Sequence, residues 1–136
     1  MKEMNAYLTF DGTCREAMKF YAECTGGELN LMKFSEAPGN FPAEAKDRIM
    51  HARLAKGGAV IMASDSMPGQ PHIVGNNVWV AIKCESAEET EKLFAAFSEN
   101  GKVVMPVGET FWAVRFGMLT DQFGVNWMFN FEKPRQ

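Results

Sequence analysis

The residues of this chain that are suited to chemistry fall into two groups, one in each half of the sequence. In the first half, His51 lies within the apolar segment Ile49–Leu54. If Ala52 and Leu54 face a core, His51 faces the opposite side of the strand. Its imidazole is then a base, a ligand contact, a metal ligand, or a hydrogen-bonded histidine without a further role. The second histidine, His72, lies in a Pro/Gly-rich segment and is expected to face solvent.

The second group is the short stretch from Glu109 to Arg115, which combines a carboxylate, a hydroxyl, two aromatic rings and a guanidinium. Arg115 is suited to binding an anionic group through two parallel hydrogen bonds. The alternative is an ion pair between Glu109 and Arg115 that braces a loop. Trp112 either lines a pocket or covers an interface between two copies of the chain.

Both groups must be positioned by elements that the chain contains twice. Thr13-Cys-Arg-Glu16 and Ser86-Ala-Glu-Glu89 are both capping-box patterns. Each precedes an amphipathic helical stripe, and glycines then end the helix, Gly26-Gly27 in the first half and Gly101 in the second. This repetition predicts one structural module that is used twice.

Strands are expected around these helices. Asn5–Phe10 alternates, which places Tyr7 on the face opposite Leu8 and so adds Tyr7 to the candidate ligand contacts. A turn glycine opens an apolar strand in each half, which puts Met62 and Met128 at equivalent positions. The remaining strands are predicted at 29–34, 49–54, 59–63, 78–83, 102–106, 113–119 and 125–131.

The predicted fold is α+β, with two tandem β-α-β-β-β modules that form a curled mixed sheet with a cup. One domain, residues 1–136, is expected, with module 1 at about 1–65, a linker at 66–76 and module 2 at about 77–133. Helices on one face of each sheet would leave the other faces to line the cup.

Composition excludes several classes of function. The net charge is −3 and basic residues form no cluster, which argues against nucleic-acid binding. No apolar run is long enough for a membrane span, and the first residues do not resemble a signal peptide. Three cysteines without a C-x-x-C pair favour a reducing cytoplasm over a disulfide framework.

Several motifs resemble one family along essentially the whole chain. They include Cys14-Arg-Glu-Ala17, His51-Ala52, Ser64-Asp65 and, most specifically, Arg115-Phe-Gly117 with Thr120-Asp-Gln-Phe-Gly-Val-Asn-Trp127. Together they are similar to the vicinal-oxygen-chelate superfamily of glyoxalases, extradiol dioxygenases and bleomycin-resistance proteins. The closer resemblance is to its PhnB-like subgroup, also called demethylubiquinone-methyltransferase-like. No Gly-rich loop of a Rossmann-type methyl-donor site follows any strand, so methyl transfer is not expected.

The resemblance also implies where a metal would bind. Metal-using members carry four His, Glu or Gln ligands on the strands of the cup, at positions that correspond here to Asn5, Met62, Asn77 and Met128. Two thioethers and two neutral amides are a poor donor set for Zn²⁺, Ni²⁺ or Fe²⁺. We therefore expect no metal and no other cofactor.

The sequence thus favours a cytoplasmic protein that binds a small organic molecule in an apolar cup and perhaps converts it without metal. The predicted ligand contacts are Tyr7, His51, Met62, Trp112, Arg115 and Met128. A homodimer is expected because half-sheets leave edge strands to cover, and the resemblance implies the same. Two alternatives stay open: a metal-dependent lyase or dioxygenase with an atypical ligand set around His51, and a resistance-type protein that sequesters a cationic drug.

Overall fold

The computed structural model describes residues 1–134, which divide into two compact units. Unit 1 comprises Met1–Ile73, and unit 2 begins at Val74. The boundary falls within the segment 66–76 that the sequence suggested as a linker. That the two modules form a single domain stays a prediction. Within residues 1–134, no helix has the length and apolar character that crossing a membrane requires.

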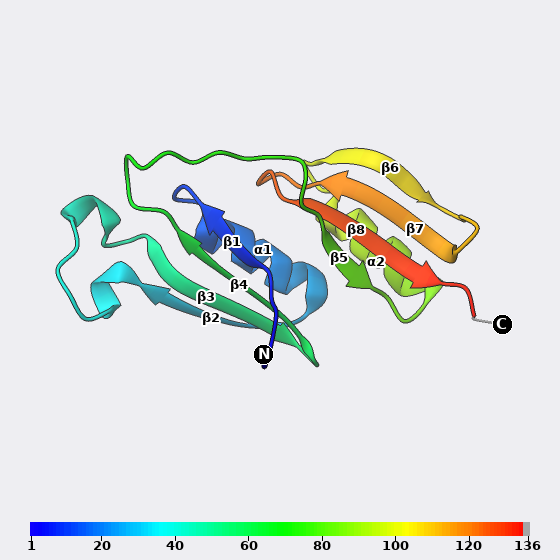
Figure 1. Cartoon of the computed structure of the whole chain (residues 1–136), viewed down its shortest axis with the longest axis horizontal. Coiled ribbons are helices and arrows are strands. Elements are labelled where there is room, and N and C mark those ends of the chain that lie inside the picture. The colour runs from blue at the N-terminus through cyan, green and yellow to red at the C-terminus, as the bar shows by residue number, and fades with distance from the viewer. Residues whose placement is uncertain (135–136) are drawn as a thin grey trace. The chain divides into compact units, whose positions relative to one another are not determined.

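Unit 1 contains one α-helix beside a four-stranded mixed sheet (Figure 1). The sheet has the order β1-β4-β3-β2, in which β1 runs parallel to β4 and the other pairs are antiparallel. Two short 3₁₀ turns, Phe34–Glu36 and Ala43–Ala45, lie in the loop before β3. The bounds of the main elements are β1 Tyr7–Phe10, α1 Cys14–Thr25, β2 Glu28–Lys33, β3 Ile49–Lys56 and β4 Ala59–Asp65.

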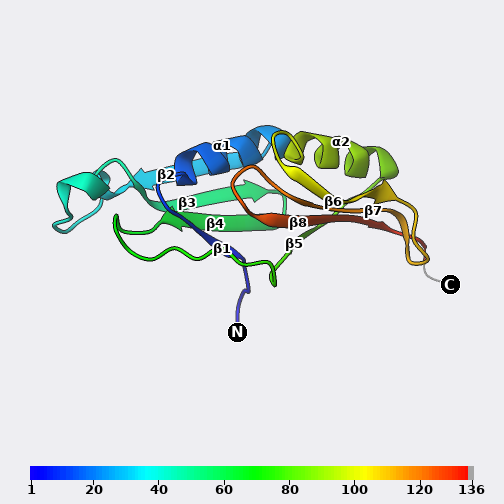
Figure 2. The same ribbon diagram turned by 90° about the horizontal axis from the view of Figure 1, so that it is seen from above.

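The helix of unit 1 covers one face of its sheet, as Figure 2 shows. The buried side chains of α1 include Ala17, Met18 and Tyr21, and those of the strands include Ala52 and Ala63. Because side chains alternate along a strand, the residues next to these in β3 and β4 point to the other face of the sheet. We call that other face, which no helix of unit 1 covers, open face 1.

Unit 2 repeats the arrangement with the sheet order β5-β8-β7-β6 (Figure 1). β5 is parallel to β8, and the other pairs are antiparallel. The elements are β5 Val80–Lys83, α2 Ala87–Phe97, β6 Lys102–Gly108, β7 Ala113–Thr120 and β8 Asn126–Glu132. The predicted α+β fold of two tandem β-α-β-β-β modules is therefore confirmed.

The core of unit 2 is an aromatic cluster between α2 and β8. The ring of Phe97 lies 4.8 Å from that of Trp127 and 5.2 Å from that of Phe129, and Phe94 packs edge-on against Phe129 at 5.6 Å. Trp127 and Phe129 thus face the helix, and Met128 between them points to the opposite face. We call that opposite face open face 2.

The predicted helix boundaries hold in part. Gly26 ends α1 in the left-handed conformation, with φ of 72°, and its N–H donates to Ala22 O at 2.8 Å. Ser86 caps α2 as predicted, because its Oγ accepts the N–H of Glu89 at 3.0 Å. Gly101 does not end α2 directly: the helix stops at Phe97, and Asn100 takes the left-handed conformation with φ of 57°.

The predicted cap at Thr13 is wrong. Thr13 makes no side-chain cap hydrogen bond at the start of α1. Asp65, at the end of β4, instead accepts the N–H groups of Gly12 and Cys14. A carboxylate from a distant strand has replaced the local hydroxyl.

Candidate functional site

Open face 1 brings together three of the predicted ligand contacts. Met62 of β4 pairs in register with Tyr7 of β1, so both side chains lie on the same face. The Tyr7 hydroxyl reaches Nδ1 of His51 on β3 at 3.0 Å, and the two rings lie 5.8 Å apart at 32°. Tyr7 is 48% exposed. The predicted alternation around His51 is thus correct, and a phenol, an imidazole and a thioether share one surface.

Sequence reasoning overlooked Arg53. It pairs across β3 and β4 with Met62 and lies two residues from His51, so its guanidinium belongs to open face 1. The spacing of two along a predicted strand was the signal that could have revealed it. The next residue in the same cross-strand row is Asn30 of β2.

On open face 2, Met128 is at one end of a row of three methionines. It pairs with Met118 of β7, which pairs in turn with Met105 of β6. Unbranched thioether side chains adapt to apolar ligands of different shapes, and a row of them makes a pliable surface. Trp112 lies at the edge of this face, because its ring packs 5.2 Å from that of Phe116, which pairs with Asn130.

Asn130 also lies on open face 2 and carries an unusual atom. Its Oδ1 is buried, and among residues 1–134 it has no hydrogen-bond partner. Its Nδ2 donates to Glu132 at 3.4 Å. Because a buried polar oxygen without a donor is costly, this atom is a natural acceptor for a ligand N–H or O–H.

Arg115 lies on the other side of the sheet from Met128. Arg115 pairs with Phe131 and alternates with the same face as Gly117 and Leu119, whereas Met118 pairs with Met128. Its Nε bonds to Oε1 of Glu91 on α2 at 3.3 Å. The alternative pair between Glu109 and Arg115 does not form either. Glu109 bonds to Lys133 at 2.9 Å, and that contact lowers the pKa of Glu109 below its ordinary value.

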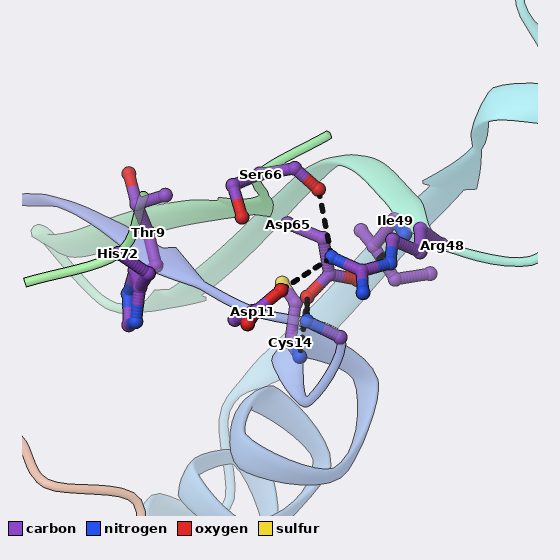
Figure 3. A network of polar contacts seen from close by, with 9 residues as sticks. Thr9, Asp11, Cys14, Arg48, Ile49, Asp65, Ser66 and His72 are labelled. Carbon is purple, nitrogen blue, oxygen red and sulfur yellow. Dashed lines mark hydrogen bonds and ion pairs between the residues drawn. The ribbon is translucent and has the colours of Figure 1, made fainter. Parts of the chain in front are cut away.

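Figure 3 shows a polar network at the carboxyl end of β4 that holds unit 1 together. Asp65 is 5% exposed. Its Oδ1 accepts the N–H groups of Gly12 at 2.9 Å and Cys14 at 3.0 Å, and its Oδ2 accepts that of Ile49 at 2.8 Å. Arg48 bridges the carboxylate of Asp11 and the carbonyl of Ser66. All these groups are engaged with one another, so the network is structural.

His72, at the edge of the same view, is bonded rather than simply solvated. One of its ring nitrogens lies 2.8 Å from the carbonyl oxygen of Thr9 (Figure 3). The ring is exposed, and the contact ties the segment after β4 to β1 within unit 1. His72 is therefore a tether in this fold.

One hollow of the described residues contains none of the predicted ligand contacts. It measures about 810 Å³ and lies in unit 2 beside the turn before β8. Its two buried polar side chains are already hydrogen-bonded to backbone groups. Asp121 accepts the N–H groups of Phe123 and Val125, and Asn126 donates to the carbonyls of Gly75 and Val78. We regard it as a consequence of this turn and not as the site.

The residues present do not fit the metal that the resemblance implies. Met62 and Met128 offer thioethers where metal-using relatives carry imidazoles or carboxylates. Among residues 1–134, no group of three or more His, Cys, Asp or Glu side chains is arranged to hold a metal ion. His51 has a tyrosine hydroxyl on Nδ1 and a methionine, Met32, as its cross-strand neighbour. We therefore derive no chemistry through a metal.

Two β-α-β-β-β modules, each with a helix on one face of a mixed sheet, define the class of glyoxalase-like proteins. The model of the family described as 3-demethylubiquinone-9 3-methyltransferase matches residues 2–129. The chain belongs to this family, the PhnB-like subgroup of the vicinal-oxygen-chelate superfamily, as its motifs predicted.

Known relatives support this assignment. Protein YjdN of Escherichia coli (strain K12) is 36% identical over 147 residues, with 97% of each chain covered. The crystal structure of protein PA1353 from Pseudomonas aeruginosa has a TM-score of 0.90 at 44% identity, covering 98% of this chain and all of that one. A putative 3-demethylubiquinone-9 3-methyltransferase, PhnB protein, from Bacillus cereus has a TM-score of 0.78 at 26% identity, covering 96% and 99%.

The fold extends further than this family. Proteins labelled as glyoxalase or bleomycin-resistance proteins, from Frankia sp. EAN1pec and Albidiferax ferrireducens T118, have TM-scores of 0.67 and 0.62. Their sequences are only 12% and 16% identical to this chain. At such identities the likeness concerns the fold alone.

Proposed function

We propose that this protein binds a small apolar or amphiphilic organic molecule on the open faces of its sheets. The observation that carries the proposal is open face 1, where Tyr7, His51 and Met62 form one surface opposite the helix. Open face 2, taken by itself, offers an apolar lining from Met128 and Trp112 and the Oδ1 of Asn130, which has no partner among residues 1–134. A mixture of apolar and few polar groups is typical of small-molecule sites.

Any conversion of the bound molecule is proposed to proceed without metal. The thioethers of Met62 and Met128 and the shared hydrogen bond of His51 support this over a metal-dependent lyase or dioxygenase. His51 and Tyr7 are side chains of the types that serve as general acids or bases in enzymes, and both lie on open face 1. Arg115 is left out of the proposed site because its guanidinium pairs with Glu91 on the helix side.

The proposal also includes a cytoplasmic homodimer. β2 and β6 are edge strands of their sheets, and β6 exposes Val103, Val104 and Met105 by 45%, 48% and 44%. Exposed apolar edges need cover. Sedimentation velocity at micromolar concentration should give a dimer, and a monomer at that concentration would remove this part of the proposal.

The binding proposal is tested with N-phenyl-1-naphthylamine, a neutral apolar dye whose fluorescence rises in apolar surroundings. Titration into the wild-type protein should show saturable binding. Met62→Gln should weaken the dye on open face 1, and Met128→Gln that on open face 2, each by about fivefold, because each replaces an apolar contact by a polar amide. Met4→Gln is the matched control, since Met4 is 83% exposed and lies before β1.

Two outcomes would contradict the proposal. One is a wild-type protein that does not bind the dye at all. The other is an equal loss of dye affinity in all three variants, which would show that the dye does not bind on the open faces. Thermal unfolding of each variant, followed by circular dichroism, establishes that the changes do not act through misfolding.

A further inference from the structure

Open face 1 contains a straight row of side chains across all four strands of its sheet. Tyr7 of β1 is in register with Met62 of β4, Met62 with Arg53 of β3, and Arg53 with Asn30 of β2. Directly opposed side chains in a sheet have their Cβ atoms about 4.5–5.5 Å apart. The row therefore places an apolar thioether between a phenol on one side and a guanidinium on the other.

His51 adds a third polar side chain beside Tyr7 and Arg53. It lies two residues before Arg53 on β3, which puts the two side chains about 7 Å apart along the same face. The Tyr7 hydroxyl lies 3.0 Å from its Nδ1. Tyr7 therefore crosses above β4 to reach β3, and its hydroxyl, the imidazole and the guanidinium surround the surface over Met62.

The guanidinium of Arg53 differs from those of the other arginines within residues 1–134. Arg48 pairs with Asp11, Arg115 pairs with Glu91, and Arg15 donates to the carbonyl of Asp47. Arg53 is exposed, and within the same residues it has neither a side-chain hydrogen bond nor an ion pair. Glu28 lies on the same face, because it pairs with Ala55, and it makes no ion pair with Arg53.

We propose that Arg53, Tyr7 and His51 form a subsite for the carboxylate of an aromatic acid, whose ring lies over Met62. A guanidinium binds a carboxylate through two parallel hydrogen bonds, and an arginine without a protein partner keeps both available. Met62 and Met32, the cross-strand neighbour of His51, supply adaptable contacts for a flat apolar ring. This inference rests on the proposed function and names the class of molecule that the site binds.

The test compares 2-naphthoate with its neutral analogue 2-naphthamide by isothermal titration calorimetry. Wild-type protein should bind the acid more tightly than the amide. Arg53→Met should weaken 2-naphthoate about tenfold, the equivalent of one charged hydrogen bond, and change the amide less than twofold. Arg115→Met, the matched control on the helix side, should leave both ligands unaffected.

A second readout distinguishes direct contact from a change in overall structure. The chain has two histidines, so the imidazole nitrogens of His51 and His72 can be followed individually by NMR. On adding 2-naphthoate, the His51 signals should move and those of His72, which bonds to the Thr9 carbonyl, should stay. In Arg53→Met the His51 response should require about tenfold more ligand.

The outcomes separate the subsite from the proposed function. If the acid and the amide bind equally, and Arg53→Met affects neither or both alike, the carboxylate subsite is wrong and the binding surface stands. Loss of acid binding in Arg115→Met with retention in Arg53→Met also overturns the subsite. If wild-type protein binds neither compound and also fails to bind N-phenyl-1-naphthylamine, both proposals fall.

Discussion

The two helices of this protein begin with similar sequences and are capped in different ways. At α2, Ser86 accepts the N–H of Glu89 with its own side chain, and Glu89 accepts the N–H of Glu85 at 2.9 Å. At α1, Thr13 makes no such bond. Asp65, which is distant in sequence, accepts the donors at the start of that helix instead.

This difference shows how a local signal is overridden by a tertiary contact. A carboxylate accepts hydrogen bonds more strongly than a hydroxyl, and its charge is also favoured at a helix N-terminus. Asp65 also accepts the N–H of Ile49, so one side chain joins the start of α1 to β3 and β4. The start of α2 is stabilised by hydrogen bonds between residues close in sequence. The start of α1 is stabilised only when β4 brings Asp65 next to it in the folded unit.

The largest expected effect is the slow alkylation of Cys14, the first residue of α1, compared with Cys24. Burial, followed by the charges of Asp65 and Glu16, raises its pKa to about 12. A helix N-terminus ordinarily lowers a thiol pKa, so burial dominates here. Reaction of folded protein with iodoacetamide at pH 8 should be at least about 100-fold slower at Cys14 than at half-buried Cys24.

The same shift has a defined effect on stability. Because the folded-state pKa lies above the ordinary value of 9.0, the folded protein holds the thiol proton more tightly than the unfolded chain. The contribution of Cys14 is full below pH 9 and is lost as the pH rises towards 12. Peptide mapping that finds Cys14 alkylated as fast as Cys24 would show that the start of α1 is more open than described.

The next largest effect is expected from Asp65→Ala. Three backbone N–H groups lose their acceptor in a buried region, and we expect unit 1 to lose about 3 kcal/mol or more. Hydrogen exchange of the α1 amides measures the loss locally. Asp11→Ala is the matched control: it removes only a half-exposed ion pair with Arg48 and should cost less than about 1 kcal/mol. Equal losses would mean that Asp65 has no special role.

A smaller effect is expected at α2. Ser86→Ala removes a local cap and should destabilise that helix by about 1 kcal/mol. Thr13→Ala is the corresponding change at α1 and should cost less than about 0.5 kcal/mol, because its hydroxyl caps nothing. Hydrogen exchange of the amides in α1 and α2 measures the stability that each variant loses. A larger loss of stability in Thr13→Ala than in Ser86→Ala would reverse the comparison.

Much of this fold could be predicted from the sequence because the deciding signals are local. Alternation placed Tyr7 and His51 on one face, and the turn glycines placed Met62 and Met128 at equivalent strand positions. Gly26 ends α1 because its φ of 72° suits a residue without a side chain. Each of these predictions needs only neighbours in the sequence.

The rest depends on contacts that no local pattern contains. Arg115 alternates with Gly117 and Leu119 on the helix side of β7, but only the folded unit brings it to its partner Glu91 on α2. The acceptor for the start of α1 is Asp65, which β4 brings there only in the folded sheet. The importance of Arg53 likewise appears only when the partners of the other arginines are known.

The most direct test of the binding surface uses the methionines as reporters. Protein labelled with ¹³C at the methionine methyl groups is titrated with 2-naphthoate and followed by NMR. The account predicts that the signal of Met62 on open face 1 moves. Those of Met4, exposed before β1, and Met18, a buried residue of α1, should stay in place. Shifts at Met4 or Met18 with a stationary Met62 would contradict the claim that the open face of the sheet is the site.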